Sequence, residues 1–318
     1  MLRVLCRDTP GVTVCSELAG WSLPAGAVWI DLELPTRDEE LALEHALSIN
    51  LPTREEMAAL EPSSRLYREN NATFMTTSLL HQPAEGHAVE APVTFVLTDG
   101  VLVTIRYSEL RAFTAFLARV EEPPTFSRGG ECFVDLLDAV VERLASILEQ
   151  TAQNVEAASQ ETFSRDAVAS FRPLLSALAQ SQAMTAKVRT SLASLARMLS
   201  FATLAPEVEN DQERKRHLHA LQRDVQSLTE HSSFLSGNVA FLLDAALGLI
   251  NIQQNGIIKF FSVVAVVFLP PTLFASIWGM NFHHMWELDQ PWGYPLAIAV
   301  MICSGLLPYW WFRRKGML

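Results

Sequence analysis

The chain has 318 residues, a formal net charge of −11 and 49% hydrophobic residues. This acidic balance argues against nucleic-acid binding, because a polyanion needs a basic face. The four cysteines, Cys6, Cys15, Cys132 and Cys303, form no CxxC pair. Their spacing argues against a Cys-rich metal site and predicts a reducing compartment without a disulfide framework.

Residues 1–125 are predicted to form a mixed α/β domain. Two β-rich runs joined by Asp99-Gly100 span residues 93–106 and are typical of a hairpin. Residues 27–31 and 72–78 are further strand candidates. Thr36 and Thr53 are each followed three residues later by a glutamate, so each predicts the start of a short helix, the first of which reaches residue 47.

An acidic cluster surrounds the first of these helices and consists of Asp31, Glu33, Asp38, Glu39 and Glu40. Helix capping accounts for Asp38 and Glu39, and a regulatory Mg²⁺ site is the alternative. The N-terminus shows no apolar leader, so we expect this body to lie in the cytosol.

Residues 121–130 are predicted to be a linker because they are rich in proline and glycine. Residues 126–256 are predicted to form a helical stalk. No proline lies between Pro206 and Pro270, and apolar residues recur at helical spacing over this stretch. They are Leu218, Leu221, Val225, Leu228, Leu235, Val239, Leu242, Ala246 and Leu249, with Ser232 interrupting the stripe. We expect one helix to leave the body, pack against copies of itself and enter the membrane.

Two uncharged apolar runs close the chain, Phe260–Trp278 and Trp292–Phe312. As helices they would each span about 28–32 Å, close to the hydrocarbon thickness of a bilayer. We therefore expect a first transmembrane helix over 257–278, an extracytoplasmic loop over 279–292, and a second transmembrane helix with a basic tail over 293–318. The basic tail favours the cytoplasmic side, which places both termini in the cytoplasm.

One face of the first span gathers small and polar side chains with two bulky apolar ones. On a helical wheel it holds Asn255, Ile258, Ser262, Ala265, Leu269, Thr272 and Ser276. Ordinary helix–helix packing is one interpretation. The other is a pore face, with polar levels at Asn255, Thr272 and Asn281 and constrictions at Ile258 and Leu269. Because neither run holds a charge and Mg²⁺ dehydrates reluctantly, neutral oxygens would hold a hydrated ion through its outer shell.

Several segments resemble the CorA family of magnesium and cobalt transporters. They are Asn251-Ile-Gln-Gln-Asn255, Phe268-Leu-Pro-Pro-Thr272, Gly279-Met-Asn-Phe282 and Gly293-Tyr-Pro295. The likeness is closest over residues 240–318 and looser over the body. It implies a homopentameric channel in the bacterial inner membrane, an α+β cytosolic domain (an α/β funnel) followed by long stalk helices and two C-terminal transmembrane helices, in contact with membrane lipid.

The resemblance also implies roles for single residues. Gly279, Met280 and Asn281 would form the selectivity filter, and Glu287 would concentrate divalent cations at the mouth. The pore-lining residues would be Asn255, Ile258, Phe261, Leu269 and Thr272. Mg²⁺ would be both the substrate and a regulatory ligand that holds the gate shut, with Asp224 as a candidate ligand. No cofactor and no enzyme activity are expected, and the sequence holds no nucleotide-binding or hydrolase motif.

The chain departs from the family pattern in the loop after the first span. Trp278 replaces the usual tyrosine, and Trp286 stands where a proline is usual. His283 and His284 could favour Co²⁺, Ni²⁺ or Zn²⁺ because imidazole suits softer metals, or they could simply be solvated. Two alternatives stay open: a zinc transporter of the same architecture, with possible proton coupling, and a membrane-anchored adaptor without transport.

Overall fold

The computed structural model describes residues 1–7, 11–15, 21–58, 65–81, 88–120, 126–163, 171–209, 211–280 and 290–315. They divide into two compact units, Met1–Leu243 and Asp244–Leu318. The first unit holds a β-sheet, its covering helices and a helical stalk. Helix α8 (Gln212–Trp278) is continuous across the boundary between the units. This confirms the predicted long helix that joins the stalk to the first candidate span.

The described strands form one mixed sheet in the order β2-β1-β3-β7-β6-β5-β4. Strands β3 and β7 are parallel, and the other neighbouring pairs are antiparallel. The strands are β1 (Leu2–Cys6), β2 (Val12–Cys15), β3 (Ala27–Glu33), β4 (Leu66–Glu69), β5 (Ala72–His81), β6 (Val89–Thr98) and β7 (Val101–Arg106). The strands predicted over 27–31 and 72–78 are therefore confirmed as β3 and β5.

The predicted hairpin is the β6–β7 pair. Thr98 and Val101 face each other at its end, and the two residues between them have positive φ angles, 45° at Asp99 and 82° at Gly100. Positive φ at both central positions is the geometry of the two-residue turn that matches the twist of the flanking strands. Asp-Gly therefore fixes the register of the two central strands of the sheet.

Two short helices begin at the predicted capping boxes. In α1 (Arg37–Leu47) the Glu39 amide donates to the Thr36 hydroxyl at 3.3 Å, and the Thr36 amide donates to the Glu39 carboxylate at 2.8 Å. Thr53 and Glu56 exchange the same pair of bonds before α2 (Arg54–Ala58). Burial raises the pKa of Glu39, but the bonds from Thr36 and the N-terminal amine outweigh it and lower that pKa.

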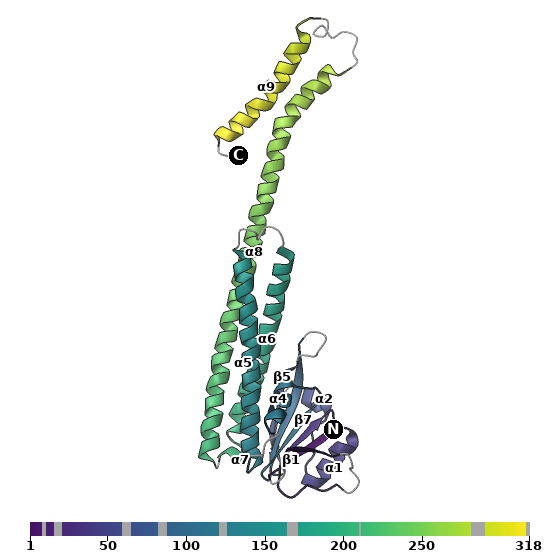
Figure 1. Ribbon diagram of the computed structural model, residues 1–318, viewed down its shortest axis with the longest axis vertical. Helices are drawn as coiled ribbons and strands as arrows, with labels where there is room; N and C mark the ends of the chain where they lie inside the picture. Colours follow the sequence, from purple (N-terminus) through teal and green to yellow (C-terminus); the bar gives the residue numbers. More distant parts are fainter. Residues whose placement is uncertain are drawn as a thin grey trace. The chain divides into compact units, whose positions relative to one another are not determined.

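Helices cover both faces of the sheet (Figure 1). One face packs residues such as Ile30 and Leu32 against Leu43 of α1 and Met57 of α2. The other face meets α4 (Arg111–Arg119), α5 (Gly129–Thr162) and α6 (Phe171–Ala202). There the ring of Trp29 lies 5.4 Å from that of Phe116, centroid to centroid. The first unit is thus a three-layer α/β arrangement, as expected for an α+β body.

A buried ion pair joins the parallel strands on the α4–α6 side. Asp31 and Arg106 are each 1% exposed. Arg106 donates to both Asp31 oxygens at 3.1 and 2.8 Å and to Glu33 at 2.9 Å, and the Thr104 hydroxyl donates to Asp31 at 2.8 Å. Burial lowers the pKa of Arg106, but its bonds and attraction to Asp31 and Glu33 outweigh burial and raise that pKa. The carboxylates of Asp31 and Glu33 therefore have a structural role, because they neutralise the buried guanidinium of Arg106.

We expect Asp31→Asn to destabilise the body by about 3–5 kcal/mol, because it leaves a buried guanidinium under-compensated. The loss is measured as a lower thermal midpoint of the full-length chain in detergent, followed by circular dichroism. Glu142→Gln is the control, since that carboxylate is 65% exposed and lies 3.6 Å from Arg119. Equal midpoints for Asp31→Asn and the wild type would contradict the assigned role.

The linker prediction is wrong at its end, because α5 begins at Gly129. A Cβ at Gly129 would lie 2.2 Å from the Leu102 amide nitrogen and 2.5 Å from the Val101 carbonyl carbon. Gly130 is less confined, since a Cβ there would lie 2.8 Å from the movable guanidinium of Arg214 and 3.2 Å from the Glu207 carbonyl oxygen. Glycine is therefore needed at position 129 for close packing of α5 on the sheet, and residues 121–125 lie outside the described part.

Helices α5, α6 and the first part of α8 lie side by side in the first unit (Figure 1). Gln182 of α6 donates to Ser236 of α8 at 2.9 Å, and Arg214 of α8 reaches Glu131 of α5 at 3.9 Å. Short helix α7 (Pro206–Glu209) precedes α8. The predicted apolar stripe is buried at Leu218, Leu221, Val225, Leu235, Val239 and Leu242. Ser232 is also buried, and its hydroxyl donates to the Thr229 carbonyl at 2.9 Å.

Candidate ion-conduction site

The second unit contains the end of α8 and helix α9 (Gly293–Arg314). Both helices are long and apolar enough to cross a membrane. The two predicted spans therefore correspond to helices in the structure.

Helix α9 packs against one face of α8. A Cβ added at Gly305 of α9 would lie 3.3 Å from both Pro271 Cγ and the Val267 carbonyl oxygen, so the glycine permits a close approach. Half-buried residues of α8 recur at helical spacing along this face. They are Val263, Val264, Val267, Pro270, Pro271, Phe274 and Trp278.

Two prolines lie inside α8 at the level of this contact. Pro270 and Pro271 have no N–H, so the carbonyls of Val266 and Val267 lose their donors within the helix. The helix nevertheless continues to Trp278. Directly after the prolines, the Thr272 hydroxyl donates to the carbonyls of Phe268 at 3.0 Å and Leu269 at 2.8 Å.

The predicted pore face lies opposite the face that meets α9. At 100° per residue, the centres of the two faces are about 180° apart on the helix. The predicted face is open to the surroundings: Ile258 is 54% exposed, and Phe261 and Leu269 are each 64% exposed. Asn255 and Thr272 are exposed as well. Packing within one chain therefore leaves this face without a partner helix in the described second unit.

The hydroxyls on this face all donate back to their own helix. Ser262 donates to the Ile258 carbonyl and Ser276 to the Thr272 carbonyl, each at 2.8 Å, as Thr272 does to its preceding turn. A hydroxyl has one proton and two acceptor lone pairs. With the proton engaged, the free capacity of each oxygen is acceptor capacity, which suits the donating water shell of a hydrated cation.

The predicted filter lies at the end of α8. The Gly279 amide donates to the Ala275 carbonyl at 2.9 Å and the Met280 amide to the Ile277 carbonyl at 3.3 Å, so both residues remain hydrogen-bonded to the last turn of α8. Met280 is 46% exposed. Asn281, His283, His284 and Glu287 lie outside the described residues.

Within the described part of one chain, the candidate regulatory acids are not assembled into a metal site. Asp224 is exposed on α8. In the ranges described, no group of three or more His, Cys, Asp or Glu side chains is arranged to hold a metal. Within the earlier acidic cluster, Asp31 and Glu33 pair with arginines, and Glu39 caps α1. These contacts favour the capping and structural interpretation over a metal site.

The role of Gly305 was not predicted from the sequence. Glycine in an apolar span was the available signal, because small residues let membrane helices approach closely. The partner position, Pro271, lies in a segment that the sequence had marked only as a family motif. Together the two residues fix which face of α8 is covered by α9.

A family model described as CorA-like Mg²⁺ transporter protein matches residues 24–314. The magnesium transport protein CorA of Mannheimia succiniciproducens is 36% identical over 300 residues, covering 92% of each chain. The magnesium transport protein CorA of Escherichia coli (strain K12) is 38% identical over 293 residues, again covering 92% of each chain.

The solved structure of the complete CorA magnesium transporter from Methanocaldococcus jannaschii has the same fold. Its TM-score is 0.80 at 18% sequence identity, covering 100% of this chain and 99% of that one. The family consists of membrane transporters and not of enzymes. The match along nearly the whole length establishes that the chain belongs to the CorA-like Mg²⁺ transporter family.

Proposed function

We propose that the chain conducts Mg²⁺ into a bacterial cell through a homopentameric pore in the inner membrane, with both termini in the cytoplasm. The observation that carries the proposal is the exposed, acceptor-bearing face of α8, which lies opposite the face covered by α9. Five such faces around one axis would line a pore. The side-chain oxygens of Asn255 and of Thr272 would each form a ring of hydrogen-bond acceptors in it. The named Mg²⁺ transport of relatives at 36% and 38% identity supports the choice of ion.

The pore would pass the ion with its water shell. Uncharged oxygens bind that shell weakly enough to release the ion, as conduction requires. Gly279, Met280 and Asn281 would form the filter, Ile258, Phe261 and Leu269 would narrow the path, and Glu287 would attract cations to the mouth. A +2 ion crossing about 150 mV gains roughly 7 kcal/mol, so the membrane potential can drive influx.

The pore would also transport Co²⁺ and Ni²⁺. The alternative function is that of a proton-coupled zinc transporter. We expect uptake of Mg²⁺ into proteoliposomes to compete with Co²⁺ and Ni²⁺ and to be indifferent to a pH gradient. The measurement is initial uptake of each ion with and without that gradient. Zn²⁺ uptake that outcompetes Mg²⁺ and requires the gradient would support the alternative and contradict the proposal.

Cytosolic divalent ions would close the pore by binding between subunits, and Asp224 is the candidate ligand. Its exposed place on α8 leaves it available to a neighbouring copy. The same proteoliposomes, loaded with internal Mg²⁺, provide an additional arm of the assay. Uptake slowed by internal Mg²⁺ supports gating, and Asp224→Asn should weaken that inhibition.

A further inference from the structure

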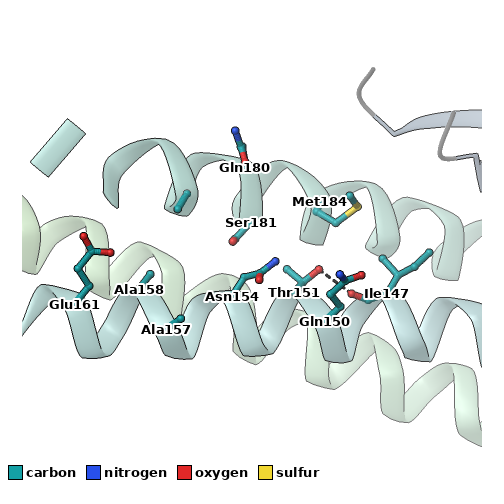
Figure 2. A pocket seen from close by; sticks show the side chains of 11 residues that line it. Ile147, Gln150, Thr151, Asn154, Ala157, Ala158, Glu161, Gln180, Ser181 and Met184 are labelled. Atoms are coloured by element: carbon teal, nitrogen blue, oxygen red, sulfur yellow. Dashed lines mark hydrogen bonds between the residues drawn. The ribbon is translucent and has the colours of Figure 1, made fainter. Parts of the chain in front are cut away.

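A hollow between α5 and α6 in the first unit has a volume of about 460 Å³ (Figure 2). Of its lining residues only Glu161 is charged, and that residue already has an interaction partner. The lining therefore presents no charge that awaits a ligand. The second unit differs, because basic side chains gather at the end of α9 on a face that α8 does not cover.

This outward face of α9 is an apolar strip that ends in a cation. It consists of Leu307, Trp310, Trp311 and Arg314, which recur at a spacing of three and four residues and so share one side of the helix. At 100° per residue, the centre of the strip lies about 170° from Gly305, the residue that meets α8. Leu307 is 66% exposed, Trp310 58% and Trp311 50%. The strip therefore points away from α8.

Two of the cations at this end of α9 lie over tryptophan rings. The guanidinium carbon of Arg314 is 5.1 Å from the centroid of the Trp310 ring, and the ammonium nitrogen of Lys315 is 4.8 Å from that of Trp311. A ring face attracts a cation but accepts none of its hydrogen bonds in the way a carboxylate does. These contacts position both cations at the end of the strip and leave N–H groups for an anionic acceptor.

No carboxylate described in the second unit is level with these cations. The sole acidic side chain in the described part of this unit is Asp244. It lies about 40 Å along α8 from Pro271, the residue that meets Gly305, whereas Arg314 lies only about 14 Å along α9 from Gly305. Arg313 adds a third exposed positive charge beside Arg314. The end of α9 is therefore a concentrated positive patch next to exposed apolar surface.

This combination fits an amphiphilic anion. Phosphate oxygens accept charge-assisted hydrogen bonds from guanidinium and ammonium groups. Tryptophan favours the level of the membrane headgroups, where its ring meets both apolar chains and polar groups. A free inorganic anion would use the cations but not the rings or the leucine. A phospholipid with a net negative headgroup would use all of them.

We propose that the end of α9 binds the headgroup of an anionic phospholipid. Arg314 and Lys315 would donate to its phosphate oxygens. The acyl chains would lie along Trp310, Trp311 and Leu307. Binding of this kind would make the stability of the chain depend on the negative lipid content of its membrane. The proposal requires that the two spans lie in a membrane, and it does not depend on which ion they conduct.

Phosphatidylglycerol added to the full-length chain in detergent tests this proposal. The readout is the thermal midpoint of unfolding, because a ligand that binds the folded form raises it. We expect a saturable rise that needs at least about ten times more lipid in the double variant Arg314→Gln/Lys315→Gln, since each basic residue near an anionic surface contributes about fivefold to binding. The matched control is Arg216→Gln/Arg223→Gln, which removes two exposed positive charges from α8 in the first unit.

Two further ligands separate the headgroup from the rest of the lipid. Phosphatidylcholine with the same acyl chains has no net charge, and inorganic phosphate has no acyl chains. We expect neither to raise the midpoint of the wild type as phosphatidylglycerol does. This comparison needs no substitution, so it still decides the question if the double variant fails to fold.

The proposal is supported if phosphatidylglycerol stabilises the wild type and the control alike, and the double variant only at the higher lipid amount. An equal effect in all three proteins would place the lipid elsewhere on the chain and overturn the proposal. Equal stabilisation by phosphatidylcholine would show apolar contact alone, and equal stabilisation by inorganic phosphate would show a site for a free anion. Either result, or no effect of phosphatidylglycerol at all, would also overturn it.

Discussion

Asn281→Ala is expected to abolish Mg²⁺ uptake in reconstituted vesicles while leaving assembly intact. In the proposed pentamer the substitution removes five carboxamide acceptors from one level of the pore. At about 1 kcal/mol for each lost hydrogen bond to the water shell, the ring loses on the order of 5 kcal/mol of ion stabilisation. Uptake is measured with a Mg²⁺-sensitive dye inside the vesicles, and assembly by size-exclusion chromatography in detergent.

Asn238→Ala is the matched control, since that asparagine lies on the part of α8 in the first unit. It should transport at the wild-type rate. An Asn281→Ala protein that assembles and still takes up Mg²⁺ at that rate would remove the filter assignment while leaving the pore-face proposal to its own test.

Thr272→Cys is expected to make transport sensitive to a positively charged thiol reagent. Thr272 lies on the exposed face of α8, so the modified side chain would carry a fixed charge into the ion path. A fixed positive charge a few ångströms from a dication costs on the order of several kcal/mol at intermediate dielectric. We therefore expect uptake to fall at least about tenfold after modification.

Val264→Cys provides the comparison, because Val264 is half-buried on the face that meets α9. Both variants are made in a Cys303→Ala background, since Cys303 is exposed on α9. Modification should leave Val264→Cys transport unchanged. Inhibition at Val264 without inhibition at Thr272 would place the ion path on the wrong face of α8 and contradict the proposed pore.

Local sequence signals predicted the elements that local chemistry determines. The Asp99-Gly100 turn, the Thr36 and Thr53 capping boxes and the periodic apolar residues of α8 each specify a structure within a few residues. Strand β1 (Leu2–Cys6) was missed, since five residues at a chain end carry a weak signal. Its pairing with β2 and β3 depends on residues up to Leu32, which a local pattern does not reveal.

Glycines show where sequence reasoning failed for a physical reason. Gly129 and Gly130 were assigned to a linker because glycine is common in loops, yet both lie in the first turn of α5. Gly129 must be small because backbone atoms of Gly100, Val101 and Leu102, which are distant in the sequence, lie where a side chain would begin. Gly305 likewise obtains its role only from contact with Pro271.

The candidate site was predictable to the level of a helix face. Helical spacing placed Asn255, Leu269 and Thr272 together, and the structure leaves that face exposed. The sequence did not reveal that the hydroxyl protons of this face are engaged by the helix backbone, because that depends on side-chain conformation.

Voltage-driven flux through the purified chain is the most direct measurement of how the ion travels. Vesicles are given an inside-negative potassium diffusion potential, and entry of Mg²⁺ is followed with and without external cobalt(III) hexaammine, an inert mimic of the hydrated ion. Entry should grow as the imposed voltage grows and should stop when the mimic is present. Vesicles that contain the folded chain yet admit no dication at any voltage would contradict conduction of a hydrated ion along the open face of α8.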